Sequence, residues 1–535
     1  MPSNFDGILY GGSVLESLEN AKSFGEFCYN RLKRHGQNVL YINGDTSERV
    51  TASQLLLGSI RVAECLQNYG IQAGDSVAIC CENRFEVPYI MFAVFFIGAT
   101  YVPLNPTYTE RELLHVCGFS HPKIIFASHQ TISKVKQVIK ETKSVKKVFV
   151  FGHKIVGSNF DTFNTFVQNK LAPTNVDFVC PPQNMMENIA LVFCSSGTTG
   201  VPKGVQITQY NVWFSISDSI IDVEPNECFL SVSPWTHIFG CYSLTRTAVH
   251  CRLTVYLPKF EEKKYLKCIE THKVTILIVV PPIMVLLSKT SLLDKYDMSS
   301  VKYAVSSAAP LNKETVEAVR KRLPQLLTRQ VYGMSEAGTF CVQTVNHCKP
   351  GSVGVLRTGV YGKVTDTETG KVLGPNSSGE LLFKSAGVMK GYVGDSDATK
   401  ASFDHDGWLH TGDVGFYDND GEYFIVDRLK ELIKYNAFQV PPAELEALIL
   451  THPNVKDVGV IGVPDEAAGE LPMAFVVKQG DCTEKDIIDF VASRTSAAKR
   501  LRGGVKFIAE IPKNPTGKIL RRVLRDLIKT QRSKL

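Results

Sequence analysis

Short apolar runs recur along residues 1–429 and alternate with stretches whose apolar positions recur at helical spacing. Runs such as DSVAICC, KIIFAS and TILIVV predict buried strands, whereas LLLGSIRVAECLQNYG and NKETVEAVRKRL predict amphipathic helices between them. Further runs of the strand type are KKVFVFG, IALVFCSS, RLTVYLP and KYAVSS. This alternation predicts an α/β fold with largely parallel sheets covered by helices.

The pattern changes twice towards the C-terminus. From residue 352 to 427, glycine becomes frequent and the apolar runs shorten, which predicts a small antiparallel or barrel-like subdomain. A charged joint then leads to a helix that begins near Pro442, and Thr483 and Asp486 form a capping-box pattern at the start of another helix. We therefore expect a large N-terminal domain, 1–429, and a smaller α+β domain, 430–535.

Composition narrows the classes of protein. A chain of 535 residues with 44% hydrophobic and 21% charged residues is typical of a globular protein with several domains. A net charge of +6 suits a small anionic ligand and gives no indication of nucleic-acid binding. Fourteen cysteines without a CxxC pair predict reduced thiols, neither a disulfide framework nor a zinc site.

Targeting signals are sparse. The longest apolar run, residues 89–104, is shorter than a bilayer span and contains Gly98 and Pro103, so no membrane span is expected. The N-terminus lacks the basic and apolar regions of a signal peptide. The final residues Ser533-Lys534-Leu535 match the signal read by the peroxisomal import receptor, which predicts a peroxisomal location.

The loop CSSGTTGVPKGV, residues 194–205, has the composition of a phosphate-binding loop: glycines, hydroxyls and one lysine. It does not fit the Walker A spacing, because Pro202 stands where that pattern needs Gly-Lys. Composition alone leaves a flexible surface loop as an equal alternative. No predicted strand is followed by GxGxxG, so a dinucleotide-binding enzyme is not indicated.

The order of several motifs is more specific. YVPLNP, SSGTTGVPKGV, SSAAPL, QVYGMSE, GWLHTGDVG, VDRLKELIKY and PTGKILRR occur in the order found in the adenylate-forming superfamily. The chain resembles this superfamily over nearly its whole length, and most of all the branch of 4-coumarate–CoA ligases, insect luciferases and luciferase-like fatty acyl-CoA synthetases. In this superfamily a carboxylate attacks the α-phosphate of ATP, which gives an acyl-adenylate and pyrophosphate.

The resemblance implies a nucleotide site. The loop would hold the β- and γ-phosphates of ATP, and Glu336 would help to hold Mg²⁺ through an oxygen ligand. Tyr332 would lie on the adenine, and Asp413 would accept hydrogen bonds from the ribose hydroxyls. The residues implied for ATP or AMP binding are Ser195, Ser196, Gly197, Thr198, Thr199, Gly200, Lys203, Ser307, Ala308, Ala309, Pro310, Tyr332, Gly333, Ser335, Asp413 and Arg428.

Both reactants are anions, so the implied catalysis is mostly positioning and charge neutralisation. Lys518 is expected to reach the carboxylate and the α-phosphate during adenylation. Lys434 would replace it after the small domain has rotated about a hinge at Lys430, and CoA would then take the acyl group. His237 would line the pocket between the acyl group and the phosphates.

The acyl pocket is implied at Trp213, Phe239, Gly240 and Phe340. Trp213 and Phe340 stand where beetle luciferases carry an arginine and a small residue. This difference predicts a bulky, apolar pocket that suits an aliphatic or differently shaped acid better than beetle luciferin. Ala308 and Ala437 replace glycines common in the superfamily. At Ala437 the added methyl group penalises positive φ beside the expected path of the CoA thiol.

Three hypotheses follow. The first is an ATP-dependent ligase that joins a medium- or long-chain fatty acid to CoA. The second is a luciferase, in which O₂ oxidises the adenylate. The third is a non-catalytic nucleotide-binding regulator, which the retention of Lys203, Glu336, Asp413, Lys434 and Lys518 disfavours.

Overall fold

The computed structural model describes residues 3–5, 7–14, 18–155, 160–168, 177–195, 202–217, 226–311, 313–436, 438–466, 468–514 and 517–532. Three sets of predicted positions lie outside these ranges: Ser196, Gly197, Thr198, Thr199 and Gly200 of the loop; Ala437; and the C-terminal residues 533–535.

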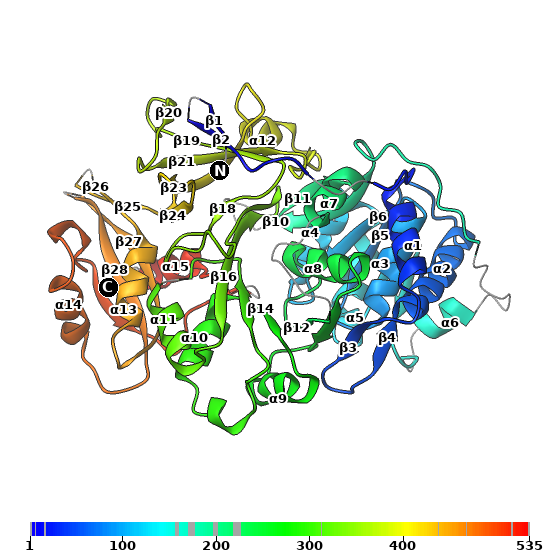
Figure 1. Ribbon diagram of the computed structural model, residues 1–535, viewed down its shortest axis with the longest axis horizontal. Helices are drawn as coiled ribbons and strands as arrows, with labels where there is room; N and C mark the ends of the chain where they lie inside the picture. The colour runs from blue at the N-terminus through cyan, green and yellow to red at the C-terminus, as the bar shows by residue number, and fades with distance from the viewer. Residues whose placement is uncertain are drawn as a thin grey trace.

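Two large sheets form the body of the N-terminal domain (Figure 1). Both are parallel at their centres and antiparallel at the ends that approach the site. The first sheet has the order β22 (Gly391–Tyr392), β11 (Lys203–Thr208), β10 (Ile189–Ser195), β6 (Thr100–Leu104), β5 (Ser76–Cys80), β7 (Pro122–Ala127), β8 (Lys147–Val150) and β9 (Asp161–Thr162). The second has the order β18 (Val355–Leu356), β17 (Gly338–Val342), β16 (Leu327–Met334), β15 (Tyr303–Ser306), β14 (Ile276–Val279), β12 (Cys228–Ser231), β13 (Leu253–Tyr256), β3 (Val39–Asn43) and β4 (Arg49–Thr51).

The predicted elements of this domain are confirmed. All seven apolar runs form strands of the two sheets, and residues 89–104 form the end of a buried helix followed by β6. The helices are α1 (Phe24–His35), α2 (Ala52–Asn68), α3 (Glu86–Phe96), α4 (Glu110–Ser120), α5 (Ile132–Glu141), α6 (Phe163–Gln168), α7 (Gln209–Ile216), α8 (Ile238–Val249), α9 (Glu262–His272), α10 (Pro281–Lys289) and α11 (Lys313–Arg322). Among the described helices, none has the length and apolar character needed to cross a bilayer.

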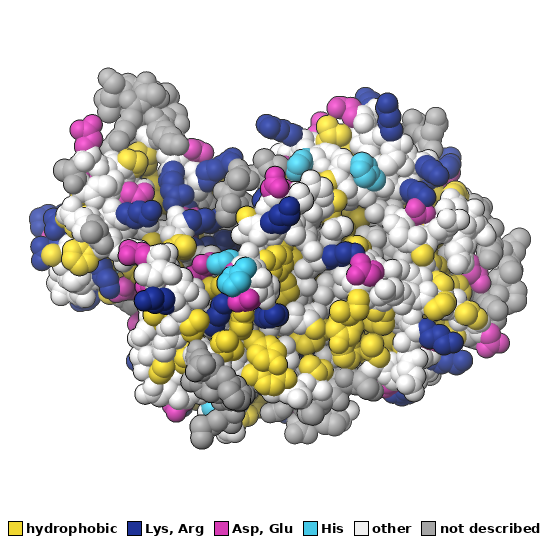
Figure 2. Space-filling model, turned by 90° about the horizontal axis from the view of Figure 1, so that it is seen from above, with side chains coloured by type: hydrophobic (Ala, Val, Ile, Leu, Met, Phe, Trp, Pro, Cys, Tyr) yellow, Lys and Arg dark blue, Asp and Glu magenta, His cyan; other side chains and the backbone are white. Residues whose placement is uncertain are grey.

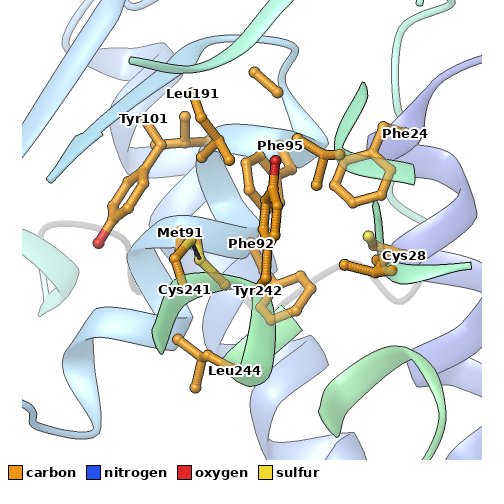
Figure 3. Close-up of a cluster of buried hydrophobic side chains, with 14 of the residues drawn as sticks. Phe24, Cys28, Met91, Phe92, Phe95, Tyr101, Leu191, Cys241, Tyr242 and Leu244 are labelled. Carbon is orange, nitrogen blue, oxygen red and sulfur yellow. Dashed lines mark hydrogen bonds between the residues drawn. The ribbon is translucent and has the colours of Figure 1, made fainter. Parts of the chain in front are cut away.

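Helix α8 is fixed by a core cluster on one of its faces. Cys241 and Leu244 are buried there, and the Cys241 thiol lies 3.6 Å from the sulfur of Met91 on α3 (Figure 3). The Tyr41 hydroxyl donates to the Leu244 carbonyl at 2.7 Å. A helix held in this way presents its remaining face in a set orientation, and that face borders the candidate site.

The predicted antiparallel subdomain is also confirmed. Its strands pair in the order β1 (Ser3–Phe5), β2 (Ile8–Tyr10), β19 (Val360–Thr365), β21 (Gly379–Ser385), β23 (Leu409–Tyr417) and β24 (Tyr423–Arg428), with β20 (Val372–Leu373) on β19. Helix α12 (Ser396–Ala401) follows β22. The addition of β1 and β2 to this sheet was not predicted, because strands of three residues carry too little periodicity.

The C-terminal domain is a small α+β unit beside β16 and helices α10 and α11 (Figure 1). Its sheet has the order β26 (Phe438–Val440), β25 (Ile433–Tyr435), β28 (Gly469–Lys478) and β27 (Val455–Asp465), with β29 (Gly504–Phe507) on β28. Its helices are α13 (Pro442–Leu450), α14 (Glu484–Ala492) and α15 (Arg521–Arg532), and α14 has the predicted capping box. The boundary at residue 430 stays a prediction, although it falls between β24 and β25.

Polar contacts hold the small domain against the large one. Lys289 of α10 donates to the Val455 carbonyl at 2.9 Å, and the Ala443 amide donates to Asp427 at 2.9 Å. Gly517 has φ +82°, and a Cβ there would come within 2.9 Å of Pro282. Only glycine fits this close approach without displacing its neighbour, and the approach brings Lys518 to the large domain.

A buried ion pair inside the small domain predicts a stability effect. Arg521 donates to both oxygens of Glu446 at 2.8 Å, and burial raises the pKa of Glu446 although Arg521 opposes that shift. Glu446→Ala would leave a buried guanidinium without its main partner, so we expect a loss of about 3 kcal/mol in the local free energy of opening. Native-state hydrogen exchange of the β27 and β28 amides measures this quantity.

Glu444→Ala is the matched control. Glu444 lies on the same helix, and its partner Lys499 is half-exposed. Exposed ion pairs contribute little, so this variant should exchange like the parent protein. Equal exchange in both variants would contradict the importance of the Glu446–Arg521 pair.

Candidate active site

Two adjoining cavities lie where the domains meet, and residues predicted for the site line both. The first, of about 500 Å³, is bordered by Ser195, Lys203, His237, Phe239, Ser307, Ala308, Gly333, Ser335, Glu336, Arg428, Lys430 and Lys518. The second is bordered by Ala308, Ala309, Pro310, Tyr332, Gly333, Asp413, Arg428 and Lys518. Figure 2 shows Lys and Arg side chains gathered beside the hollow between the small domain and the rest of the molecule.

One wall joins a lysine and a carboxylate through a tyrosine. Pairing of β11 with β22 brings Tyr392 beside Lys203, whose ammonium lies 5.0 Å from the ring centre and 3.6 Å from Asp395. The Tyr392 hydroxyl donates to Glu336 Oε1 at 3.0 Å. Burial, and then the charge of Glu336, raise the pKa of Tyr392, so the phenol stays protonated and donates. Glu336 is itself buried.

This wall suits phosphate and a divalent cation. Lysine offers a mobile positive charge to phosphate oxygens, and Glu336 offers the oxygen ligand that a hard cation such as Mg²⁺ requires. Motif reasoning missed Tyr392 and Asp395. The signal available in the sequence was weak, because β22 has two residues and its pairing with β11 links positions far apart in the chain.

The second cavity contains a carboxylate held between two partners. β23 and β24 pair so that Asp413 lies opposite Arg428, and the Arg428 Nε is 3.3 Å from Asp413 Oδ1. The Tyr332 hydroxyl donates to Asp413 Oδ2 at 2.7 Å. Burial and then Asp413 raise the pKa of Tyr332. The two contacts therefore hold the carboxylate in a fixed orientation, as an acceptor for vicinal hydroxyls requires.

The backbone near this cavity is close-packed. Ala308 has φ +74°, a conformation that costs a non-glycine residue energy. A Cβ at Gly333 would come within 1.9 Å of the Gly338 carbonyl oxygen. The chain can therefore turn past the predicted adenine position only with glycine at 333.

His237 caps helix α8 and stays neutral. Its Nδ1 accepts from the Phe239 amide at 3.3 Å, so in this tautomer Nε2 carries the proton. Burial, and then the charge of Lys518, lower the pKa of His237 to about 4. The preceding loop is fixed by Asn83, which donates to the Ser233 carbonyl at 2.9 Å and accepts from the Trp235 amide at 2.8 Å.

Lys518 lies among other cations. Burial lowers its pKa to about 8, with further lowering by Arg428 and Lys430 and partial compensation by Asp413 and Glu431. Such a cluster is preorganised for an anion, since the groups that would stabilise developing negative charge are already in place.

Lys434 takes no part in this arrangement. It is exposed on β25, its backbone amide donates to Glu470 at 2.9 Å, and it borders neither cavity. Lys518 and Lys434 thus lie at different places on one domain. Their predicted alternation between two half-reactions stays a prediction.

Three of the residues predicted for the acyl pocket do not border either cavity. The Trp213 ring lies 5.2 Å from Tyr210, and Phe340 stacks on Phe383 at 4.2 Å. Gly240 packs where a Cβ would come within 2.2 Å of the Pro234 carbonyl oxygen. Motif alignment gives a position along the chain but not the direction of a side chain. Phe239 alone of the four reaches the first cavity.

The cavity wall that sequence reasoning missed comes from α8. The residues are Ile238, Tyr242, Ser243, Arg246, Thr247 and His250, with Arg252 beyond the helix end. Residues three and four positions apart lie on one face of a helix. The sequence signal that could have predicted this wall is therefore the helical periodicity that follows His237.

The fold and the site together define an adenylate-forming enzyme. A carboxylate is held for vicinal hydroxyls, cations converge on a position for phosphate, and a cavity for a third group adjoins them. The model of the AMP-binding enzyme family matches residues 28–393, and that of the AMP-binding enzyme C-terminal domain matches residues 444–518. The chain belongs to the AMP-binding enzyme family.

Its relatives include both enzyme types expected from the motifs. The chain is 40% identical over 544 residues to a luciferin 4-monooxygenase from Nipponoluciola cruciata, and the alignment covers 99% of each protein. It is 37% identical over 533 residues to a 4-coumarate–CoA ligase from Humulus lupulus, and this alignment covers 96% of each protein. The chain is therefore an adenylate-forming enzyme of the acyl-CoA ligase or luciferase-like type.

Solved structures support the same fold. ATP-bound MatB from Rhodopseudomonas palustris superposes with a TM-score of 0.84 at 25% identity, covering 94% of this chain and 99% of that one. The luciferase-like enzyme from the nonluminescent mealworm Zophobas morio gives a TM-score of 0.73 at 27% identity, covering 80% and 100%.

The Tyr392–Glu336 contact predicts a positioning effect. Tyr392→Phe keeps the ring beside Lys203 but removes the donor to Glu336, so we expect kcat/KM for ATP to fall roughly tenfold. The Mg²⁺ concentration needed for half-maximal rate should rise as well, because the carboxylate is no longer held. Tyr417→Phe is the control, because Tyr417 is a buried tyrosine whose hydroxyl donates to the Leu373 carbonyl and which borders neither cavity. An unchanged Mg²⁺ dependence in Tyr392→Phe would count against this role.

The Lys518 pKa predicts the alkaline limb of the pH profile. Its folded-state pKa of about 8 lies below the ordinary 10.5, so Lys518 loses its charge as the pH rises through about 8. Without that charge, kcat/KM for ATP should fall about tenfold per pH unit in the free enzyme. Lys518→Arg keeps a charge at all these pH values. The residual kcat/KM of this variant for ATP should therefore not fall as the pH rises through about 8. A profile that is flat to pH 10 in the parent protein would refute this assignment.

Proposed function

We propose that this chain is an ATP-dependent acid–CoA ligase that adenylates a medium- or long-chain fatty acid and then transfers the acyl group to CoA. The observation that carries the proposal is the position of Lys518. It reaches from the small domain into the cavity that His237, Arg428 and Lys430 border, where an acid and the α-phosphate would meet. Motif similarity to ligases of this class supports the same function.

The first half-reaction makes one bond and breaks one. A carboxylate oxygen attacks the α-phosphorus of ATP, and the bond from that phosphorus to the bridging oxygen breaks, which releases pyrophosphate. Lys518 offsets the repulsion between two anions, and Lys203 takes up charge on the leaving phosphates. Glu336 would hold Mg²⁺, which supplies further charge neutralisation to the phosphates. Neutral His237 can donate from Nε2 without adding charge.

The second half-reaction would use the other lysine. The CoA thiol loses its proton, the sulfur attacks the acyl carbon, and AMP leaves with the bond electrons. Lys434 would come to the site for this step through rotation of the small domain about Lys430. The 37% identity to a 4-coumarate–CoA ligase supports CoA as the acceptor. Import into peroxisomes through Ser533–Leu535 belongs to the same proposal and suits fatty-acid metabolism.

Luciferase activity is the second candidate, favoured by the 40% identity to luciferin 4-monooxygenases. The adenylate would be the same, and O₂ would replace CoA. Light emission from ATP, O₂ and an acid without CoA would identify this function. Thioester formation without light would identify the ligase.

The two lysines predict separable losses. Lys518→Ala should lower pyrophosphate release at least 100-fold, because it removes a charge that acts on the reacting groups. Lys434→Ala should leave pyrophosphate release near the parent rate but lower acyl-CoA formation, measured by mass spectrometry of the products. Each variant is the control for the other. Equal pyrophosphate release by Lys518→Ala and the parent protein would contradict the proposed function.

A further inference from the structure

Helix α13 of the small domain is capped by a residue of the large domain. The helix begins with Pro442, whose nitrogen carries no proton, and its N-cap residue is Pro441, which has no side-chain oxygen to accept from the first turn. The Ala443 amide, at the second helical position, donates instead to Asp427 Oδ2 on β24 at 2.9 Å. Asp427 therefore takes the place of an N-cap side chain, although it lies across the domain boundary.

Both oxygens of Asp427 have fixed partners. Oδ1 accepts from the Arg428 amide at 2.7 Å, and the residue is 6% exposed. Burial raises the pKa of this carboxyl, whereas Arg521, and then the Ala443 and Arg428 amides, lower it; Glu431 raises it by a smaller amount. The positive end of α13 and the guanidinium of Arg521 both favour the ionised carboxylate, which accepts stronger hydrogen bonds than a neutral group.

Helix α13 is tied in turn to the segment that carries Lys518. Glu446, about one turn after Ala443, binds Arg521 through both of its oxygens at 2.8 Å. Arg521 follows Lys518 in the chain by less than one helical turn. The contact between Asp427 and α13 therefore fixes the small domain close to the segment that brings Lys518 to the site.

This contact spans the predicted hinge. Asp427 pairs with Val414 through the β23–β24 ladder and is part of the large domain, whereas Ala443 follows Lys430 in the chain and is part of the small domain. A hydrogen bond of this kind requires a separation of about 3 Å. Rotation of the small domain about Lys430 moves Ala443 relative to β24 and breaks the contact.

We propose that Asp427 is a positioning residue: by capping α13 it holds the small domain in the arrangement for adenylation, and this contact is released before the second half-reaction. The inference rests on the proposed function and deepens it. Because the contact is made in the arrangement that brings Lys518 to the cavities and is lost on rotation, it shifts the equilibrium between the two arrangements towards the first.

Asp427→Asn tests this role. Asparagine has nearly the same shape, but its amide nitrogen cannot accept from a backbone amide, so one contact is lost together with the charge. We expect pyrophosphate release from ATP and dodecanoic acid to fall roughly three- to tenfold. Acyl transfer from supplied dodecanoyl-adenylate to CoA should stay at the parent rate or rise, because this step no longer breaks the contact. A residue that only stabilises the fold would lower both rates alike.

Asp418→Asn is the matched control. Asp418 lies between β23 and β24, and its Oδ1 accepts from the Asp420 and Glu422 amides at 3.0 Å, so it also holds two backbone amides, but both belong to the large domain. Both half-reactions should proceed in this variant as in the parent protein. Melting temperatures verify that the two variants fold.

Lysine labelling measures the domain arrangement without relying on the second half-reaction. Acetylation by acetic anhydride, followed by mass spectrometry of the full-length chain, gives the reactivity of half-buried Lys518 relative to exposed Lys434. We expect this ratio to rise roughly threefold or more in Asp427→Asn, as the arrangement with Lys518 at the cavities becomes less populated. An unchanged ratio, or equal losses in the two half-reactions, overturns the inference while adenylation stands. A parent protein that releases pyrophosphate but forms no thioester contradicts the proposed CoA step, and the labelling ratio then decides the role of Asp427.

Discussion

The structure depends on positive charge gathered in a partly buried place. Burial lowers the pKa of Lys518, Arg428 and Lys430 lie close enough to lower it further, and Asp413 and Glu431 compensate only in part. Like charges held together cost free energy in the empty site. An anion bound between these cations offsets their repulsion. Binding of a nucleotide would therefore favour the domain arrangement in which Lys518 borders the cavities. Substrate binding and domain placement are thus linked by one electrostatic balance.

Helix α8 connects the packing of the core to the shape of the first cavity, because one of its faces lies in the core and another borders the cavity. Cys241 and Leu244 fix one face against the core, and the face that begins at His237 borders the cavity. The same helix therefore sets the neutral His237 imidazole at one end of this cavity wall and Arg246, Thr247 and His250 at the other end. A change in the packing of its buried face would move both ends together.

Sequence patterns predicted the architecture well because long apolar runs and helical spacing are local signals. The order of the motifs placed Lys518, His237 and Glu336 at one cavity for the same reason: each motif is a short, continuous segment. Contacts between distant segments were beyond this reasoning, as with Tyr392, which reaches Glu336 through a strand pairing. Trp213 and Phe340 show a second limit, since position in a motif does not tell whether a side chain faces the core or the cavity.

The positions of the two lysines constrain the order of the chemistry. Lys434 belongs to β25, which pairs with both β26 and β28, and Lys518 follows β29, which pairs with β28. Both side chains are therefore attached to one sheet and move with it as a body. Because Lys518 borders both cavities while Lys434 borders neither and is exposed to solvent, no small side-chain movement exchanges them. A reaction that uses both lysines must proceed in two steps separated by a movement of the whole domain.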